Sequence, residues 1–322
     1  MSDATTAVSA RLAGRIRRET RALARHLKDA RGADSRAVHQ ARVSSRRLRE
    51  MLAIAEGVPG EDRTAAKVRR LGRRLGPLRE LEVSRGVWRE PAHTAAWPQV
   101  VLSALERLAE LEFGREAAAA RRAIDRHGGA GLAKALDAMA GDLVAAPRDR
   151  MLRDTLLRSS RERRQALLRA TARAGTIYAA GPLHEVRIAT KKLRYAVELA
   201  RDLAGVPAAR ALRRLRAQQD LLGRLHDLQV VQERVLAIGA TQGVARGMLR
   251  ATKVTRLAIE AECRELHAQF VAGSALVLVA VAAVNADAAI RLMRPKSRRM
   301  TARATRPGEA VPASAIRRRT RS

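Results

Sequence analysis

Cysteine and aromatic residues are scarce in this 322-residue chain, and each shortage excludes a class of structure. The single cysteine, Cys263, rules out an internal disulfide framework and a cysteine-based metal cluster, and it fits a reducing compartment such as the cytoplasm. Aromatic residues make up only 2% of the chain, so the stacking platforms used by readers of single-stranded nucleic acid are scarcely available. Phosphate groups are therefore a more natural target than bases.

Targeting and membrane-spanning segments are also lacking. The N-terminal sequence MSDATTAVSARLAGRIRRE does not place an apolar run after a charged segment, as a secretion signal would. The longest apolar stretch, residues 270–284, is shorter than the roughly 20 residues that a spanning helix needs. We interpret this stretch as a buried helix, with a membrane anchor as the alternative. We expect a cytoplasmic protein without membrane contact.

Acidic residues are too few to balance the basic ones. The chain holds 64 Lys and Arg against 32 Asp and Glu, which gives a formal net charge of +32. A field of this size concentrates polyanions and speeds their capture. Because 47% of the residues are hydrophobic, the chain can also build a core. Composition therefore predicts a folded protein with a strongly acidic partner.

The chain is expected to be helical along nearly all of its length. Ala, Leu, Arg and Glu dominate, and apolar residues recur at three- and four-residue steps without β-branched alternation. Glycine and proline divide this sequence into helices of ordinary length, which predicts an antiparallel helical bundle. The expected breaks fall at residues 57–60, 91, 97–98, 127–131, 147, 181–182 and 205–207.

Two pairs of segments repeat in the same order at an offset of about 145 residues. VHQARVSSRRLREML matches LHEVRIATKKLRYAVEL, and LGPLRELEV matches LGRLHDLQV. The repeat predicts a duplicated helical unit with halves at residues 1–146 and 147–293. The remainder, residues 294–322, is rich in Arg and Lys with a single acidic residue, and such a composition predicts a disordered basic tail.

The first repeated pair carries a basic stripe along each of two predicted helices. At about 100° per residue, basic side chains gather on one face in both copies and apolar side chains gather on another. A lone basic stripe is usually a solvated face. Its return in register argues for a shared site instead, because guanidinium groups offer paired donors to phosphate oxygens. The stripes comprise His39, Arg42, Arg46 and Arg49 in the first copy, and His184, Arg187, Lys191 and Arg194 in the second.

The four repeated segments closely resemble the paired motifs of the CHAD domain family, histidine-containing α-helical domains that bind inorganic polyphosphate. The resemblance covers roughly residues 5–290. It implies two four-helix bundles related by a pseudo-twofold, with a basic channel between them, and attachment to polyphosphate granules in bacteria. The phosphate-binding residues that it implies here are His39, Arg42, Arg46, Arg47, Arg49, Arg79, His184, Arg187, Lys191, Lys192, Arg194 and His226.

Residues around these motifs depart from the family in places. Glu80 stands where the family often has Asp, whereas Asp227 agrees with the family. Lys67, Arg73 and Arg74 are weaker candidates for the same channel, because only Lys67 has a basic counterpart in the second half.

Catalytic and metal-binding motifs are not recognisable. GxxxxGK, HExxH and nucleophile-elbow patterns do not occur. Glu110 and Glu112 imitate the alternating glutamates of the triphosphatase domain found in some relatives, but Gly114 occupies the place of its lysine. Arginine neighbours of His39 and His184 would repel a divalent cation. We therefore expect a non-catalytic binding protein without metal or other cofactor.

Two other functions compete with polyphosphate binding. A basic tail and a high isoelectric point are also typical of nucleoid-type DNA-binding proteins, and the tail could give a secondary nucleic-acid contact. A histidine phosphotransfer domain would show lysine and glycine soon after the histidine, but HQARV has Arg42 and Val43 there. The repeated stripes favour a dedicated site for a narrow polyanion.

Overall fold

The fold consists of α-helices throughout the part of the chain that the structure describes. The structure is a computed structural model that describes residues 8–293, with side chains through residue 283. No strand occurs within those residues, so the prediction of an all-α fold is confirmed. The helices are α1 (Val8–Ala30), α2 (Ser35–Ile54), α3 (Glu61–Arg74), α4 (Gly76–Trp88), α5 (Pro91–Ala96), α6 (Gln99–His127), α7 (Ala130–Ala145), α8 (Asp149–Ala174), α9 (Ala180–Ala204), α10 (Ala209–Gly239) and α11 (Arg246–Met293).

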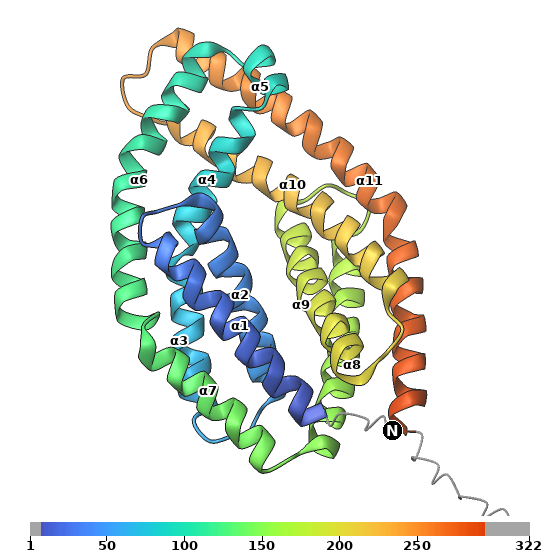
Figure 1. Cartoon of the computed structure of the whole chain (residues 1–322). Helices are drawn as coiled ribbons and strands as arrows, with labels where there is room; N and C mark the ends of the chain where they lie inside the picture. The colour runs from blue at the N-terminus through green and yellow to red at the C-terminus, as the bar shows by residue number, and fades with distance from the viewer. Residues whose placement is uncertain (1–7, 294–322) are drawn as a thin grey trace, which may run out of the picture.

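The helices are arranged as two columns that meet at both ends, which gives the molecule an oval outline (Figure 1). Helices α1, α2, α3 and α7 form one column, and α8, α9 and parts of α10 and α11 form the other. Helices α4 and α5 and the turn between α10 and α11 close one end. Helix α6 runs along the outside of the first column.

Three hydrophobic cores hold these helices together. The first lies mainly among α1, α2, α3 and α7, and the second among α8, α9, α10 and α11. The third joins α4 and α6 to α10 and α11 through buried residues that include Trp88, Leu105, Leu228 and Ile259. The two repeated halves therefore share a core. The internal duplication and its division into two bundles remain predictions with which this arrangement is consistent.

Local signals in the sequence explain where the motif-bearing helices begin and end. Helix α2 begins at an N-cap, Asp34, whose carboxylate accepts a hydrogen bond of 2.6 Å from the backbone N–H of Ala37. Pro77 occupies the first turn of α4, where a missing N–H costs nothing. Helix α9 ends at Gly205, whose left-handed backbone (φ 68°) favours glycine. The repeated segments thus lie on α2 and α9, and on α4 and α10.

Most of the predicted helix breaks coincide with helix ends, but one is misplaced and three breaks in the structure were not predicted. Gly181 and Pro182 lie inside the first turn of α9, and the chain turns at residues 175–179 instead. The turn at residues 31–34 between α1 and α2 and the junction at Leu75 between α3 and α4 were not predicted. Neither was the turn at residues 240–245 between α10 and α11, although Gly243 has a left-handed backbone (φ 75°) that marks it.

The apolar stretch predicted as a buried helix forms the later part of α11. Phe270, Val277 and Val281 are buried in the second core, whereas Leu276 and Val279 on the other face are exposed. By length and composition alone, α11 is also the one helix among the described residues that is long and apolar enough to cross a membrane. The segment is therefore a helix with one buried face. The expectation that the protein avoids membranes stays a prediction.

Candidate polyanion-binding site

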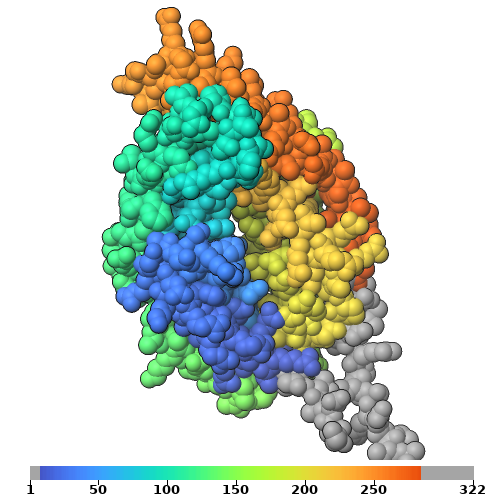
Figure 2. Space-filling view, turned by 45° about the horizontal axis from the view of Figure 1, so that its top comes forward, coloured from blue at the N-terminus to red at the C-terminus, as the bar shows by residue number. Residues whose placement is uncertain are grey.

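The repeated segments meet at one cavity, which we call the central cavity. It has a volume of about 460 Å³ and is lined by residues of α2, α4, α9 and α10. The molecular surface is hollowed between the first column and α10 (Figure 2). Of the residues implicated by sequence, the lining includes His39, Arg42, Arg46, Arg79, Arg187, Lys191 and His226.

Arg42 of α2 is held in the cavity wall by a neighbouring helix end. Its Nη1 donates a hydrogen bond of 2.9 Å to the backbone carbonyl of Gly72 in α3. Its Nε is buried and has no acceptor among the described residues. Burial, followed by repulsion from Arg46, lowers the pKa of Arg42 to about 10. Arg42 is thus a desolvated cation with one donor group left unpaired.

Lys191 and Arg187 of α9 face the same space from the second half. Burial, followed by repulsion from Arg187 and Arg46, lowers the pKa of Lys191 to about 7. Burial also lowers the pKa of Arg187, against the attraction of Asp227, and its buried Nε has no acceptor in the described part of the chain. Because Arg46 belongs to α2 and Lys191 to α9, the fields of the two halves overlap in one cavity.

The pKa values of both cavity histidines are lowered from the ordinary value of imidazole. Burial, followed by repulsion from Arg187, lowers the pKa of His226 to about 4. Burial, followed by repulsion from Arg79, lowers the pKa of His39. His184 is exposed and does not line the cavity, but its ring centroid lies 5.3 Å from that of His226. Neutral imidazoles can each donate a hydrogen bond to a phosphate oxygen without adding charge.

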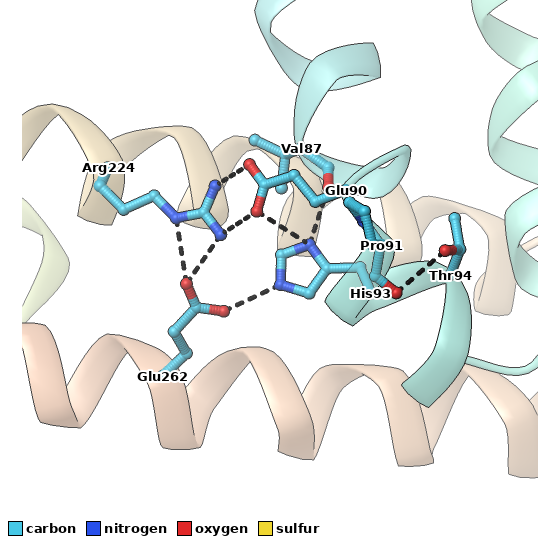
Figure 3. Close-up of polar contacts among 7 residues, drawn as sticks. All are labelled: Val87, Glu90, Pro91, His93, Thr94, Arg224 and Glu262. Atoms are coloured by element: carbon cyan, nitrogen blue, oxygen red, sulfur yellow. Dashed lines mark hydrogen bonds and ion pairs between the residues drawn. The ribbon is translucent and has the colours of Figure 1, made fainter.

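Arg224 of α10 also lines the central cavity, and sequence reasoning missed it. Its guanidinium bonds to both Glu90 and Glu262, at 2.7 and 2.8 Å from Nη2 (Figure 3). Glu262 also lies 3.0 Å from Nε2 of His93, whose ring stacks on Trp97 with centroids 4.3 Å apart. These contacts join α4 and α5 to α10 and α11 next to the cavity. They fix Arg224 and neutralise part of its charge.

Several implicated residues lie outside the cavity lining. Arg47 forms an ion pair of 3.0 Å with Glu19 of α1. Arg194 donates hydrogen bonds of 2.6 Å to Glu198 and 2.7 Å to Gln219. The remaining two are Arg49 and Lys192, and both residues are exposed. Their role in binding phosphate stays a prediction.

The chemistry of the cavity suits an anion with many oxygen atoms. Its carboxylates, Glu80, Asp220 and Asp227, are outnumbered by cationic side chains. Burial raises the pKa of Asp227 despite the nearby Arg187. Among the described residues, no group of three or more His, Cys, Asp or Glu side chains is placed to hold a metal ion. A bound polyanion would supply acceptors for the unpaired Nε donors and relieve the mutual repulsion of the cations.

Fold and site together define a helical protein with a polycationic cavity where four repeated segments meet, and comparison with known proteins identifies its family. The family model of the CHAD domain matches residues 14–236, so the chain belongs to the CHAD domain family. This confirms the resemblance drawn from the motifs. No match was found among curated proteins.

Solved structures of similar fold include two that cover most of this chain. The crystal structure of the CHAD domain from the plant Ricinus communis is 25% identical, with a TM-score of 0.63 over 88% of this chain and 94% of that one. PptA from Streptomyces chartreusis is 18% identical, with a TM-score of 0.60 over 83% of this chain and 99% of that one. At that identity, the second likeness shows the fold alone.

Proposed function

We propose that the protein binds inorganic polyphosphate in the central cavity and does not turn it over. The observation that carries the proposal is the convergence of desolvated cations from α2 and α9, with the buried Nε groups of Arg42 and Arg187 left without acceptors. Leaving buried donors unpaired costs about 1–3 kcal/mol each. A phosphate chain offers oxygen acceptors at every unit and would recover that cost.

The cavity suits a narrow chain better than a duplex. Proteins that read DNA place basic residues on a protruding helix or ribbon that enters a groove. Here the basic residues line a concave space of about 460 Å³ between helices. The lining contains no Phe, Tyr or Trp, so it offers no aromatic platform for bases. DNA binding remains the second candidate through the basic segment 294–322, which lies outside the described residues.

A competition experiment tests this choice of polyanion. Labelled long-chain polyphosphate is bound to the protein at near-physiological salt and displaced with unlabelled polyphosphate or duplex DNA at equal phosphate concentration. We expect polyphosphate to displace the label at a much lower concentration than DNA. Equal or better displacement by DNA would reject the proposal in favour of a nucleoid-type protein.

The absence of turnover is tested on the same complex. Purified protein should neither shorten nor extend polyphosphate, with or without added divalent metal, and should release no phosphate from nucleoside triphosphates. Release of phosphate that is lost in both His39→Gln and His226→Gln would show that the cavity is an active site.

We further propose that polyphosphate binding localises the protein to polyphosphate granules in the cytoplasm. A fluorescent fusion should coincide with granules in cells that accumulate polyphosphate and become diffuse in cells that cannot make it. A fusion carrying Arg42→Glu and Arg46→Glu should be diffuse in both. Unchanged granule localisation of that variant would assign targeting to another part of the chain.

A further inference from the structure

A second basic hollow lies on the outside of the first half, and we call it the outer groove. It has a volume of about 730 Å³ and lies between the last turns of α3, the start of α4 and the second half of α6. The cationic side chains that line it are Arg70, Arg73 and Arg74 from α3, and Arg122 and Arg126 from α6, beside His127. Cations from two helices therefore face one shared space.

The arginines of the outer groove lack the acidic partners that other surface arginines of this protein have. Arg85 and Arg89, for example, share Glu106. In contrast, no carboxylate of the described side chains lies within 4.0 Å of any of the five groove arginines. The groove's one acidic residue, Glu116, pairs with Arg115 at 3.4 Å. The cations are thus uncompensated in a protein that pairs many others.

His127 reports how these charges converge. Burial lowers its pKa, and repulsion from Arg70 and Arg126 lowers it further. Those two arginines belong to different helices, so the fields of α3 and α6 meet at one imidazole. Like charges four residues apart, such as Arg122 and Arg126, also repel within α6. An anion in the groove would reverse both effects and raise the pKa of His127.

We propose that the outer groove is a second binding site for inorganic phosphate chains. Guanidinium groups from both walls can grip phosphate oxygens in pairs. No Phe, Tyr or Trp lines the groove, so it offers no aromatic stacking for a nucleotide base. The choice of ligand rests on the function proposed for the central cavity, but the groove's geometry is independent of it.

The linings of the two sites both include the start of α4. Gly76 lines the central cavity, and the next residue, Pro77, lines the outer groove. A long chain that leaves the cavity past this turn can continue into the groove, where its second set of contacts forms at a high effective concentration. We infer that one long polyphosphate chain occupies both sites, whereas a triphosphate occupies each site separately.

Two double variants separate the sites. The groove variant carries Arg73→Glu and Arg122→Glu, one change on each wall. The cavity variant carries Arg42→Glu and Arg46→Glu. Both groove arginines are exposed, so the groove variant should melt like the parent protein.

A charge control carries Arg161→Glu and Arg169→Glu. Both residues are exposed on α8 and line neither site, and the change in net charge is the same. Any effect that a double variant shares with the charge control is caused by the change in net charge alone.

Tripolyphosphate is titrated into the protein. Calorimetry measures how many equivalents bind, and NMR monitors the histidine rings. In the parent protein we expect two equivalents to bind, with shifts at His127 from the groove and at His39 and His226 from the cavity. The groove variant should bind one equivalent and lose the response of His127 alone. For long polyphosphate, it should lose at least about tenfold in affinity relative to the charge control.

The outcomes separate this inference from the function of the central cavity. If the parent protein binds one equivalent of tripolyphosphate and His127 does not respond, the outer groove is rejected as a binding site. The proposal for the central cavity is then unaffected. If His127 responds and neither His39 nor His226 does, tripolyphosphate binds in the outer groove and binding in the central cavity is rejected. A groove variant that binds long chains as tightly as the charge control would overturn the continuous path.

Discussion

At the residue scale, burial and neighbouring charge determine how each cation behaves. Arg42 and Lys191 are both desolvated in the central cavity, but only the lysine has its pKa lowered into the physiological range. Arginine stays charged throughout that range because even its lowered pKa remains near 10. The cavity therefore combines permanent charges with one that depends on pH.

The pKa of Lys191, about 7 in the free protein, predicts pH-dependent binding. In the free protein, burial and then repulsion from Arg187, Arg46 and Arg42 lower the pKa of Lys191. A bound polyanion stabilises the charged form of Lys191, so its pKa is higher in the complex. Above pH 7 the free protein must then take up a proton to bind. Affinity should fall by up to about tenfold per pH unit above pH 7, and the contribution of Lys191 should level off below about pH 6.

Comparing Lys191→Met with Lys192→Met checks this effect by calorimetry between pH 6 and 9. The first variant should bind more weakly at pH 6 and lose most of the pH dependence. The second removes the same charge from an exposed side chain and should keep the dependence of the parent protein. A Lys191→Met profile parallel to that of the parent protein would assign the proton to another group.

The same lowered pKa makes a separate prediction for stability. An unfolded chain keeps lysine near its ordinary pKa of 10.5, so it binds more protons than the folded protein between pH 7 and 10.5. Burying charged Lys191 therefore lowers the free energy of unfolding by its full amount below pH 7. This loss of stability becomes smaller as the pH rises and disappears near pH 10.5. Without ligand, Lys191→Met should raise the melting temperature more at pH 6.5 than at pH 9.5. An equal change at both values would contradict the lowered pKa.

Five of the eight residues in the two predicted stripes line the central cavity, but sequence patterns could not identify every residue of its lining. Arg47 was expected there, but Glu19, which is distant in sequence, holds it. Arg194 is held by Glu198, and their four-residue spacing was a visible signal. Arg224 was missed because its place in the repeat corresponds to Pro77, so comparing the two copies gave no basic pair. Partners distant in sequence determine where Arg47 and Arg224 lie, and helical angle alone does not predict them.

At the scale of the elements, α10 and α11 connect the two halves through the polar contacts of Figure 3. The repeated segments all lie on helices, α2, α4, α9 and part of α10, because apolar periodicity is a local property of the sequence. The third core depends on how the long helices cross, and sequence periodicity does not encode that. The sequence could therefore predict the elements that carry the site but not the core that joins them.

Glu262 tests how much this connection contributes to stability. Glu262→Ala removes one of the two carboxylates that hold Arg224 and also the acceptor near His93. We expect the free energy of unfolding to fall by about 1–3 kcal/mol, measured by urea denaturation. Glu265→Ala, an exposed glutamate on the same helix, should stay within about 0.5 kcal/mol of the parent protein. Equal stability of both variants would show that the contacts of Glu262 are energetically neutral.

At the scale of the whole molecule, the net charge of +32 acts before any contact forms. Long-range attraction raises the rate of capture, and it weakens as salt increases. The segment 295–322 adds to this field with few apolar residues, so we expect it to steer polyanions rather than form the specific site.

Deleting residues 295–322 should slow the association of polyphosphate and weaken DNA binding more than polyphosphate binding. Stopped-flow association rates and equilibrium titrations at several salt concentrations measure both effects. A larger loss for polyphosphate than for DNA would mean that this segment, and not the helical part, holds the polyphosphate.

The central claim is that one phosphate chain contacts α2 and α9 together, and the most direct test compares ligand length across variants. The affinities of long polyphosphate and tripolyphosphate are measured for the cavity variant, for an α9 variant carrying Arg187→Glu and Lys191→Glu, and for the charge control. Circular dichroism and thermal melting must first show that all three are folded. Relative to the charge control, each stripe variant should lose at least about 100-fold for long chains and much less for tripolyphosphate. Its slope of log affinity against log salt should flatten by about 1.5, because two phosphate contacts are lost. Folded stripe variants that bind long chains like the charge control, with unchanged salt slopes, would contradict the account.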